Sequence, residues 1–183
     1  MDVAALILSM LSLVVAVVGT HLANKRSKEA MELSQCAAVD ARWSSLQEAT
    51  QRLIGFDPTA EPVGDRLANL RIAMVALIDE LPEWTLLDEW LQTAHALGAA
   101  LGRQVMESAK PGDSVDQRLS NLDPLMTWAQ VLSSNLRRLR ATGHDVDALE
   151  KLTSHNKSLI VQTHEKNGWA PRPDANPRIS PLE

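Results

Sequence analysis

The run of uncharged residues at 3–20 constrains this chain most. It reads VAALILSMLSLVVAVVGT, and ten of these eighteen residues are Leu, Ile or Val. As a helix the run is roughly 27 Å long, close to the ~30 Å hydrocarbon core of a bilayer. Each Leu, Ile or Val favours membrane insertion by about 0.3–0.6 kcal/mol, and no charge opposes them. The run therefore predicts a transmembrane helix.

The charges that flank this run predict how the helix is oriented. Asp2 is the only charged side chain before it, whereas Lys25, Arg26 and Lys28 follow it. A cleaved signal peptide carries its positive charges in front of the apolar run and a small-residue cleavage site behind it. Neither is present, and the positive-inside rule keeps the basic flank in the cytoplasm. We expect a retained single-pass anchor in a bacterial inner membrane, with the N-terminus outside and the rest of the chain cytoplasmic. A cleaved signal peptide and a buried soluble helix are the alternatives.

Small residues recur within the run at steps of 4, 3, 4 and 3 residues. They are Ala5, Ser9, Ser12, Ala16 and Gly19. This spacing places them on one side of a helix. Lipid provides no hydrophobic drive for helix association, so transmembrane helices associate through the close packing of small residues. The stripe predicts a homodimer or higher oligomer formed through the anchor, although Ala and Ser are also common in anchors that do not associate.

Composition excludes several classes of protein. The net charge of −5 argues against a nucleic-acid-binding protein, which needs a basic face. The single cysteine, Cys36, excludes an intrachain disulfide, a CxxC redox pair and a cysteine zinc finger. Hydrophobic residues make up 45% of the chain, which is enough to build a core.

The rest of the sequence predicts an all-α protein. Helical spacing of apolar residues recurs throughout, and no alternating strand pattern is found. The predicted segments are the anchor with its basic flank at 1–28, an amphipathic helical stalk at 29–56, a linker at 57–64, a cytoplasmic bundle of four or five helices at 65–168, and a Pro-rich disordered tail at 169–183. No proline precedes Pro58, so the anchor is expected to continue into the stalk as one helix.

Two apolar patterns indicate how these helices pack. In the stalk, one face is formed by Val39, Trp43, Leu46, Thr50 and Leu53. In the first helix of the bundle, 65–81, apolar residues follow the same 3/4 spacing, and residues 72–78 are largely apolar all round. A helix that is apolar on every side is typically buried, so this helix is expected to be the central one.

Other residues predict where helices end and where they approach closely. Pro82 ends one helix, and Thr85 with Asp88 resembles a capping box for the next. In that next helix Ala94, Gly98 and Gly102 are four residues apart, which favours close approach of another helix backbone. The remaining predictions are a short helix at 115–122, a helix that starts at Asp123-Pro124 and stops at Gly143, and a last helix that starts near Asp145 and ends at Gly168.

The tryptophans have predicted structural roles. Trp84, Trp90 and Trp128 are expected to fill the core. Trp169 is expected to dock the start of the tail onto the bundle, the alternative being a peptide bound by another protein.

An acidic group is the first candidate for chemistry. Its members are Asp79, Glu80, Glu83, Asp88 and Glu89. Carboxylates can bind Mg²⁺ or Ca²⁺ or exchange protons. Helical di-metal sites, however, use Glu-x-x-His pairs, and none is present. A solvated helix junction is therefore the preferred interpretation, and no metal or cofactor is predicted.

A basic run near the end of a helix is the second candidate. Arg137, Arg138 and Arg140 could pair with the acidic group, within the chain or across a dimer, or face anionic lipid head groups. Cations at a helix C-terminus are also favoured by the helix dipole alone, which is the simplest explanation.

No catalytic motif is found. The histidines His95, His144, His155 and His164 do not have the spacing of metal ligands, and the nucleophile-elbow, phosphate-loop and zinc-protease motifs do not occur. The sequence therefore predicts a non-enzymatic protein that acts as an interaction, scaffold or regulatory module for an unknown protein partner at the bilayer. The alternatives are a small metal-dependent or small-molecule helical enzyme that uses the acidic group at 79–89, and a phage-type membrane effector.

Overall fold

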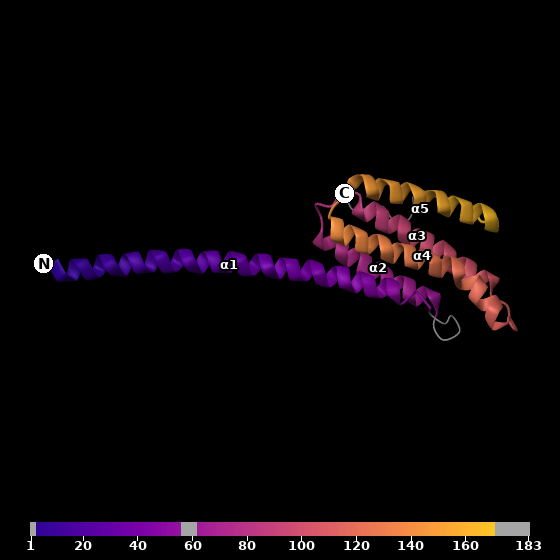
Figure 1. The fold of residues 1–183 in the computed structure, drawn as a ribbon, viewed down its shortest axis with the longest axis horizontal. Coiled ribbons are helices and arrows are strands. Elements are labelled where there is room, and N and C mark those ends of the chain that lie inside the picture. The colour runs from indigo at the N-terminus through magenta and orange to yellow at the C-terminus, as the bar shows by residue number, and fades with distance from the viewer. Residues whose placement is uncertain (1–2, 56–61, 171–183) are drawn as a thin grey trace. The chain divides into compact units, whose positions relative to one another are not determined.

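Five helices packed as a bundle make up the fold, so the all-α prediction is confirmed. The computed structural model describes the backbone of residues 3–55 and 62–170, and within residues 3–23 it describes the side chains of Thr20 and His21 only. The helices are α1 (Val3–Gln51), α2 (Val63–Glu80), α3 (Leu87–Ser108), α4 (Val115–Thr142) and α5 (Val146–Asn167) (Figure 1).

The chain divides into two compact units, Met1–Ala41 and Arg42–Glu183. In the first unit, residues 24–37 of α1 are exposed, and Lys25 lies 3.9 Å from Glu29. No helix is long and apolar enough to cross a membrane within the part of the chain that is described. The predicted anchor and its small-residue stripe, Ala5 to Gly19, lie outside the described side chains. Both therefore stay predictions.

The second unit contains the core, and the last turns of α1 contribute to it. Trp43, Leu46 and Leu53 are buried, as the stalk pattern predicted. Thr50 is buried between them, and its hydroxyl donates a hydrogen bond of 2.8 Å to the carbonyl oxygen of Leu46. This bond satisfies the hydroxyl within its own helix, so a polar residue is accommodated in an apolar face.

The helix at the centre of this unit is α3, and the predicted central position of α2 is wrong. α3 packs against α2, α4 and α5 (Figure 1), and nine of its 22 residues are buried. On α2, Ile72 is 68% exposed and Val75 is 48% exposed. α2 packs on α3 and contacts the end of α1 through Arg42 and Glu80, so its outer side is uncovered among the described residues. An apolar circumference indicates burial only if enough neighbouring helices exist.

Two glycines of α3 accept side chains from other helices. A Cβ atom added to Gly98 would lie 2.3 Å from the Trp128 ring, and one added to Gly102 would lie 2.8 Å from Val63. A packing role of these glycines is thus confirmed, but the predicted close approach of a second helix backbone is wrong at these two positions, because side chains fill the space. Trp90 and Trp128 are buried in the core, as expected, whereas Trp84 is only half-buried.

α4 is one helix where the sequence predicted two. It begins after Ser114, whose hydroxyl accepts a hydrogen bond of 3.2 Å from the backbone N–H of Gln117. Pro124 lies inside the helix and does not start it. Leu122 and Leu125 on either side of this proline are both buried, and only a continuous helix keeps both in the core. Their packing outweighs the backbone hydrogen bond that proline removes.

The ends of α4 and α5 follow the sequence signals, whereas the start of α3 does not. Gly143 and Gly168 have φ values of 83° and 66°, and Asp145 caps α5 by accepting the N–H of Ala148 at 3.0 Å. The predicted Thr85 cap is wrong, because α3 begins after Leu86, which has a φ of 67° and provides no side-chain cap.

Packing of Trp84 explains the turn that precedes α3. The Trp84 ring lies 5.7 Å from the Trp43 ring and is stacked at 5.3 Å on the His144 ring. These contacts hold the turn at residues 82–86 from two sides. The turn is therefore held by tertiary packing together with local backbone hydrogen bonds, such as that from the Leu87 N–H to the Trp84 carbonyl oxygen at 3.2 Å, and not by a side-chain cap.

Candidate functional site

The structure distributes the acidic group among several partners. Asp79 and Glu80 end α2, Glu83 lies in the following turn, and Asp88 and Glu89 begin α3. Glu80 pairs with Arg42 at 3.4 Å, and Glu89 pairs with Lys157 of α5 at 2.8 Å. Gln92 donates a hydrogen bond of 2.7 Å to Asp88. These contacts stabilise helix junctions.

Metal-type donors do not converge in the part of the chain that the structure describes. No group of three or more His, Cys, Asp or Glu side chains is placed there to hold a metal ion. A divalent cation prefers several oxygen ligands at once, and the partners of Glu80 and Glu89 lie on different helices. Glu80, Asp88 and Glu89 of this group are engaged with separate partners and not with one another.

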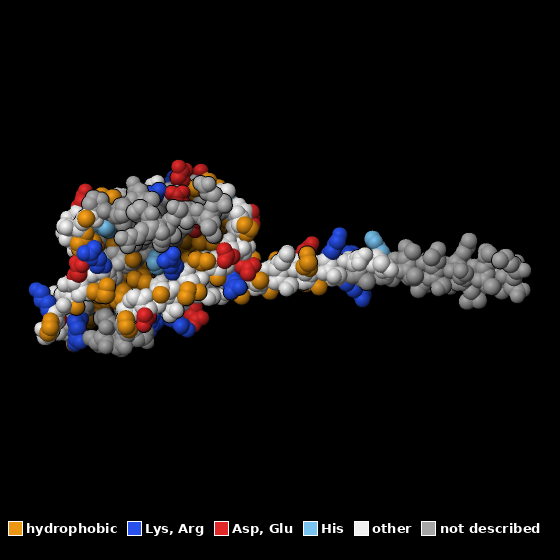
Figure 2. All heavy atoms as spheres, turned by 180° about the vertical axis from the view of Figure 1, so that it is seen from behind, with side chains coloured by type: hydrophobic (Ala, Val, Ile, Leu, Met, Phe, Trp, Pro, Cys, Tyr) orange, Lys and Arg blue, Asp and Glu red, His pale blue; other side chains and the backbone are white. Residues whose placement is uncertain are grey.

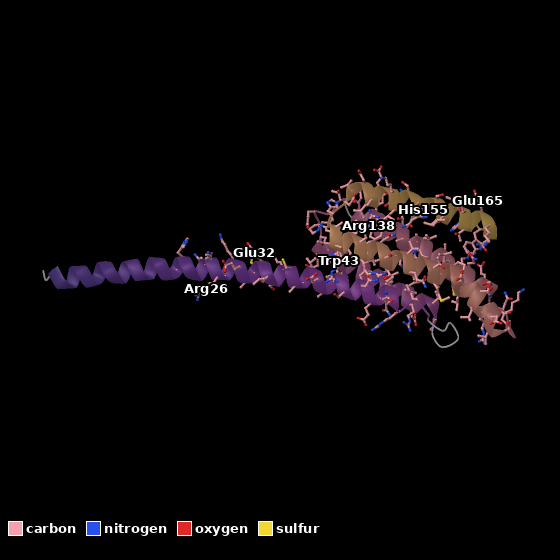
Figure 3. The ribbon with its side chains drawn as sticks, viewed as in Figure 1. Arg26, Glu32, Trp43, Arg138, His155 and Glu165 are labelled. Carbon is pink, nitrogen blue, oxygen red and sulfur yellow. The ribbon has the colours of Figure 1, made fainter. Side chains whose placement is uncertain are left out.

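The basic run lies in the last turns of α4, and its arginines have different surroundings. Arg140 donates a hydrogen bond of 3.4 Å to the hydroxyl of Ser44. Arg138 (Figure 3) lines a hollow of about 470 Å³ together with Asp145, Asp147 and Lys151. Arg137 is exposed. Charges of both signs line this hollow, so it has no strong preference for an anion.

Three histidines bond to backbone carbonyl oxygens. The pairs are His95 with Leu67 at 3.2 Å, His144 with Thr85 at 3.0 Å, and His164 with Ala170 at 3.1 Å. A carbonyl oxygen only accepts, so the ring nitrogen in each pair carries the proton and donates it. These nitrogens connect segments of the fold and are not available as metal ligands. His155 lies on the exposed side of α5 (Figure 3).

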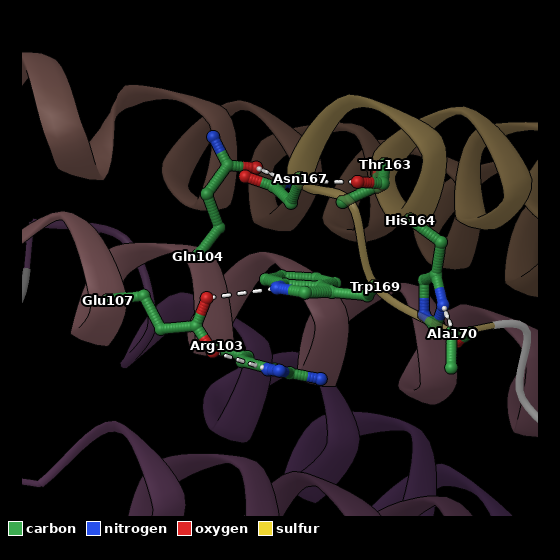
Figure 4. A network of polar contacts seen from close by, with 8 residues as sticks. All are labelled: Arg103, Gln104, Glu107, Thr163, His164, Asn167, Trp169 and Ala170. Carbon is green, nitrogen blue, oxygen red and sulfur yellow. Dashed lines mark hydrogen bonds and ion pairs between the residues drawn. The ribbon is translucent and has the colours of Figure 1, made fainter.

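The most developed polar cluster joins the end of α5 to α3 (Figure 4). The Trp169 indole N–H donates a hydrogen bond of 2.9 Å to Glu107, and the Arg103 guanidinium lies 4.2 Å from the Trp169 ring centre. Arg103 also pairs with Glu107 at 2.6 Å, and the His164 ring meets Trp169 edge-on at 5.4 Å. We call Arg103, Glu107, His164 and Trp169 the Trp169 clamp. The expected docking of Trp169 onto the bundle is confirmed.

Charge in the clamp is balanced. The hydrogen bond from Arg103, together with that from Trp169, lowers the pKa of the Glu107 carboxyl below its ordinary value. Glu107 is therefore ionised at neutral pH and accepts from both donors. The arrangement holds the Trp169 ring in place, and its parts are engaged with one another, so it is a structural contact.

An exposed apolar ridge on α2 is one of several apolar surfaces that the described helices leave uncovered. Ala68, Ile72 and Val75 follow one another at steps of 4 and 3 residues, and all three are exposed. We call these residues the α2 ridge. A hollow lies on each side of it, one of about 370 Å³ with Ile72 in its lining and one of about 360 Å³ with Val75 in its lining.

The rims of the two hollows are polar. Arg42, Arg52 and Arg66 line the first hollow, and Arg71 and Asp88 line the second. Acidic and basic side chains lie interspersed among apolar ones over the face of the bundle in Figure 2. An apolar centre with a polar rim is the usual composition of a protein–protein contact.

Sequence reasoning did not identify the ridge or the partners of Trp169. The apolar circumference of residues 72–78 contained the signal for the ridge, but it was interpreted as burial. Arg103 and Glu107 are four residues apart, a spacing typical of an ion pair on a helix. That spacing could have suggested the ion pair, but not its contact with Trp169, which is 62 residues from Glu107.

Comparison of this chain with known protein families, with characterised proteins and with solved structures finds no match.

Proposed function

We propose that this chain is a single-pass membrane protein whose helical bundle acts as an interaction module, as a scaffold or regulatory partner, on the cytoplasmic face of the membrane. The uncharged run at 3–20 and the basic flank Lys25, Arg26 and Lys28 support the anchor and its orientation. The small-residue stripe in that run supports self-association.

The α2 ridge is the observation that carries the interaction role. Ile72 and Val75 expose 68% and 48% of their surface on the outer side of α2, whose inner side packs on α3. Contiguous apolar surface with a polar border typically marks a contact site. The ridge with a hollow on each side has the form of a helix surface that accepts another helix, because ridges of one helix pack into grooves of the next.

Site-specific photo-crosslinking in intact membranes tests the interaction role. A photoreactive residue is placed at position 75 in the full chain, or at position 161 as the matched control. Val161 is 55% exposed on α5, so both positions are accessible. We expect a discrete protein adduct from position 75 that Ile72→Asp abolishes, and none from position 161. Equal adducts from both positions, unaffected by Ile72→Asp, would reject the α2 ridge as a contact site.

Extraction of membranes at alkaline pH tests the anchor. We expect the full chain to stay with the membrane pellet and a variant without residues 3–20 to be released. Protease added to spheroplasts should leave the bundle intact and should digest it after lysis. Release of the full chain into the supernatant would contradict the anchor, and digestion before lysis would contradict its orientation.

A bulky-residue series tests self-association. Leu in place of Ser9, Ser12 and Ala16 should weaken the oligomer in detergent sedimentation, because larger side chains keep the helices apart. The matched control places Leu at Val14, Val17 and Val18, away from the stripe. If the native chain and the stripe variant are both monomeric, self-association through the anchor is excluded.

A further inference from the structure

Few side chains of α5 are buried. Of its 22 residues only Leu149 and Thr153 are buried, at 0% and 5% exposure. Leu152, Leu159 and Ile160 are half-buried, and Val161 is exposed. Apolar burial is the main force that holds a helix in a bundle, and α5 contributes few side chains to it, although its backbone lies near that of α3 over a long stretch.

One of these two buried side chains also weakens the docking of α5. The Thr153 hydroxyl is buried and has no hydrogen-bond partner among the described residues. Thr163 on the same helix donates its hydroxyl to the Leu159 carbonyl oxygen at 2.7 Å. A buried hydroxyl loses its bonds to water when α5 docks, and at Thr153 no bond replaces them.

Polar contacts at the surface hold α5 to α3. Lys157 pairs with Glu89 at 2.8 Å, and Asn167 donates to Gln104 at 3.5 Å. The Trp169 clamp lies just beyond the end of α5, where Trp169 meets Arg103 and Glu107 (Figure 4). Exposed polar contacts are individually weak, because water competes with them. The clamp is the strongest of the three, because it combines a ring contact with a charge-assisted hydrogen bond.

The connections of α5 allow it to move separately. Its backbone lies close to that of α3, and its first turns line a hollow together with Arg138 and Leu139 of α4. At its start, Gly143, His144 and Asp145 form the link to α4, and Gly143 has a φ of 83°. Release of α5 therefore breaks its contacts with α3 and with the end of α4 and leaves the contacts of α3 with α2 and α4 in place.

We propose that α5 and Trp169 form a latch that opens as a unit while α2, α3 and α4 stay folded. In the closed state α5 covers the face of α3 that carries Glu89, Gln104 and Glu107. Ala100 lies on the same face, one turn before Gln104, and is buried at 7% exposure. Opening exposes Ala100 between these polar and charged side chains. The latch does not depend on the proposed function, because it follows from packing within the bundle alone.

Hydrogen exchange of the full chain in detergent, read by mass spectrometry, tests the latch. In native buffer, peptides from 146–167 should exchange faster than the central peptides of α2 and α3. Leu70→Ala in the α2 core should speed exchange in α2 and α3 and leave exchange in α5 unchanged. Leu70 lies in α2, which stays folded when the latch opens, so its mutation does not change the free energy of that opening. If Leu70→Ala speeds α5 exchange as much as α2 exchange, α5 opens only in global unfolding and the latch is rejected.

A threonine pair provides the second measurement. Thr153→Val keeps the shape of the side chain and removes the unpaired hydroxyl, so it should slow α5 exchange several-fold. Thr163→Val, the matched control, removes a bonded hydroxyl and should not slow it. Trp169→Ala should speed α5 exchange about tenfold. Equal effects of the two Thr→Val variants, or no effect of Trp169→Ala, would contradict the roles assigned to Thr153 and the clamp.

Discussion

α3 and α5 have the same length, 22 residues, but are held in the bundle by different forces. α3 buries nine residues against three neighbouring helices, and two of these residues are glycines that accept side chains from α2 and α4. α5 buries two residues and adds polar contacts at its surface. Equal helices can thus differ in how much of the global stability each carries.

The largest effect is expected from truncating one buried leucine in each helix. Leu97→Ala in α3 should lower the free energy of unfolding by about 2–5 kcal/mol, because it leaves a cavity in the core. Leu149→Ala in α5 should lower it less. If Leu149→Ala weakens α5 docking until the latch is open in the folded protein, any further loss of docking no longer lowers the free energy of unfolding of α2, α3 and α4. Chemical denaturation followed by circular dichroism measures both, and equal losses in one cooperative transition would remove the distinction between the helices.

A glycine replacement tests the packing of α3 alone. Gly98→Ala places a Cβ atom against the Trp128 ring, and it should cost about 1–3 kcal/mol of stability through overpacking. Gly64→Ala is the matched control, because a Cβ atom there meets nothing within 4 Å. The control should be neutral or stabilising, since alanine favours a helix more than glycine. Thermal unfolding measures both variants, and a higher melting temperature for Gly98→Ala than for Gly64→Ala would refute the close contact.

A smaller effect is expected at the helix caps. Asp145→Ala removes the cap of α5 and should cost about 1 kcal/mol, which corresponds to about fivefold faster α5 exchange. Ser114→Ala removes the equivalent cap of α4. The serine variant should leave α5 exchange unchanged. Faster α5 exchange in both variants would mean that α4 and α5 open together.

The smallest effect is expected from pH, through Glu107. Its hydrogen bonds with Arg103 and Trp169 lower its pKa in the folded protein, so the unfolded chain binds the proton more readily. The stabilisation is present above the ordinary glutamate value, about 4.3, and is lost as the pH falls through the lower pKa of the folded form. The stability advantage of the native chain over Glu107→Gln should therefore shrink as the pH falls from 7 to 3.

Glu165→Gln is the control for this titration. Glu165 lies on the exposed side of α5 (Figure 3) and outside the Trp169 clamp. The variant removes a carboxylate from outside the clamp and so controls for the change in net charge. A constant advantage over Glu107→Gln across this pH range would show that the Glu107 charge does not hold the clamp.

Local signals in the sequence were sufficient for the fold class and most helix ends. Gly143, Asp145 and Gly168 act through the backbone next to them, so their roles could be predicted. Pro124 and Thr85 also gave local signals, but Leu122 and Leu125 in the core and the packing of Trp84 outweighed them. Local chemistry predicts a helix end only where tertiary packing does not oppose it.

The candidate sites were harder to predict, because they depend on which surfaces remain uncovered. The sequence showed that Glu89 and Glu107 carry charge, but their partners Lys157 and Trp169 lie more than 60 residues away. The exposed state of Ile72 depends on the number of helices around α2, which no local pattern contains. The central position of α3 was not predicted, because its small residues contribute little hydrophobicity while they allow three helices to pack around it.

The contact between the end of α1 and α4 has a consequence for protein synthesis. Gln47 and Gln51 both donate hydrogen bonds to the buried Ser133 hydroxyl, across 86 and 82 residues. A ribosome that adds about 5–20 residues per second needs roughly 4–17 s to cover the longer of these separations. During that time the ribosome has already made Trp43 and Leu46 but has not yet made the part of α4 that contains Ser133. The interval is a window in which a chaperone, or a second nascent copy, can bind this apolar face before the bundle closes over it.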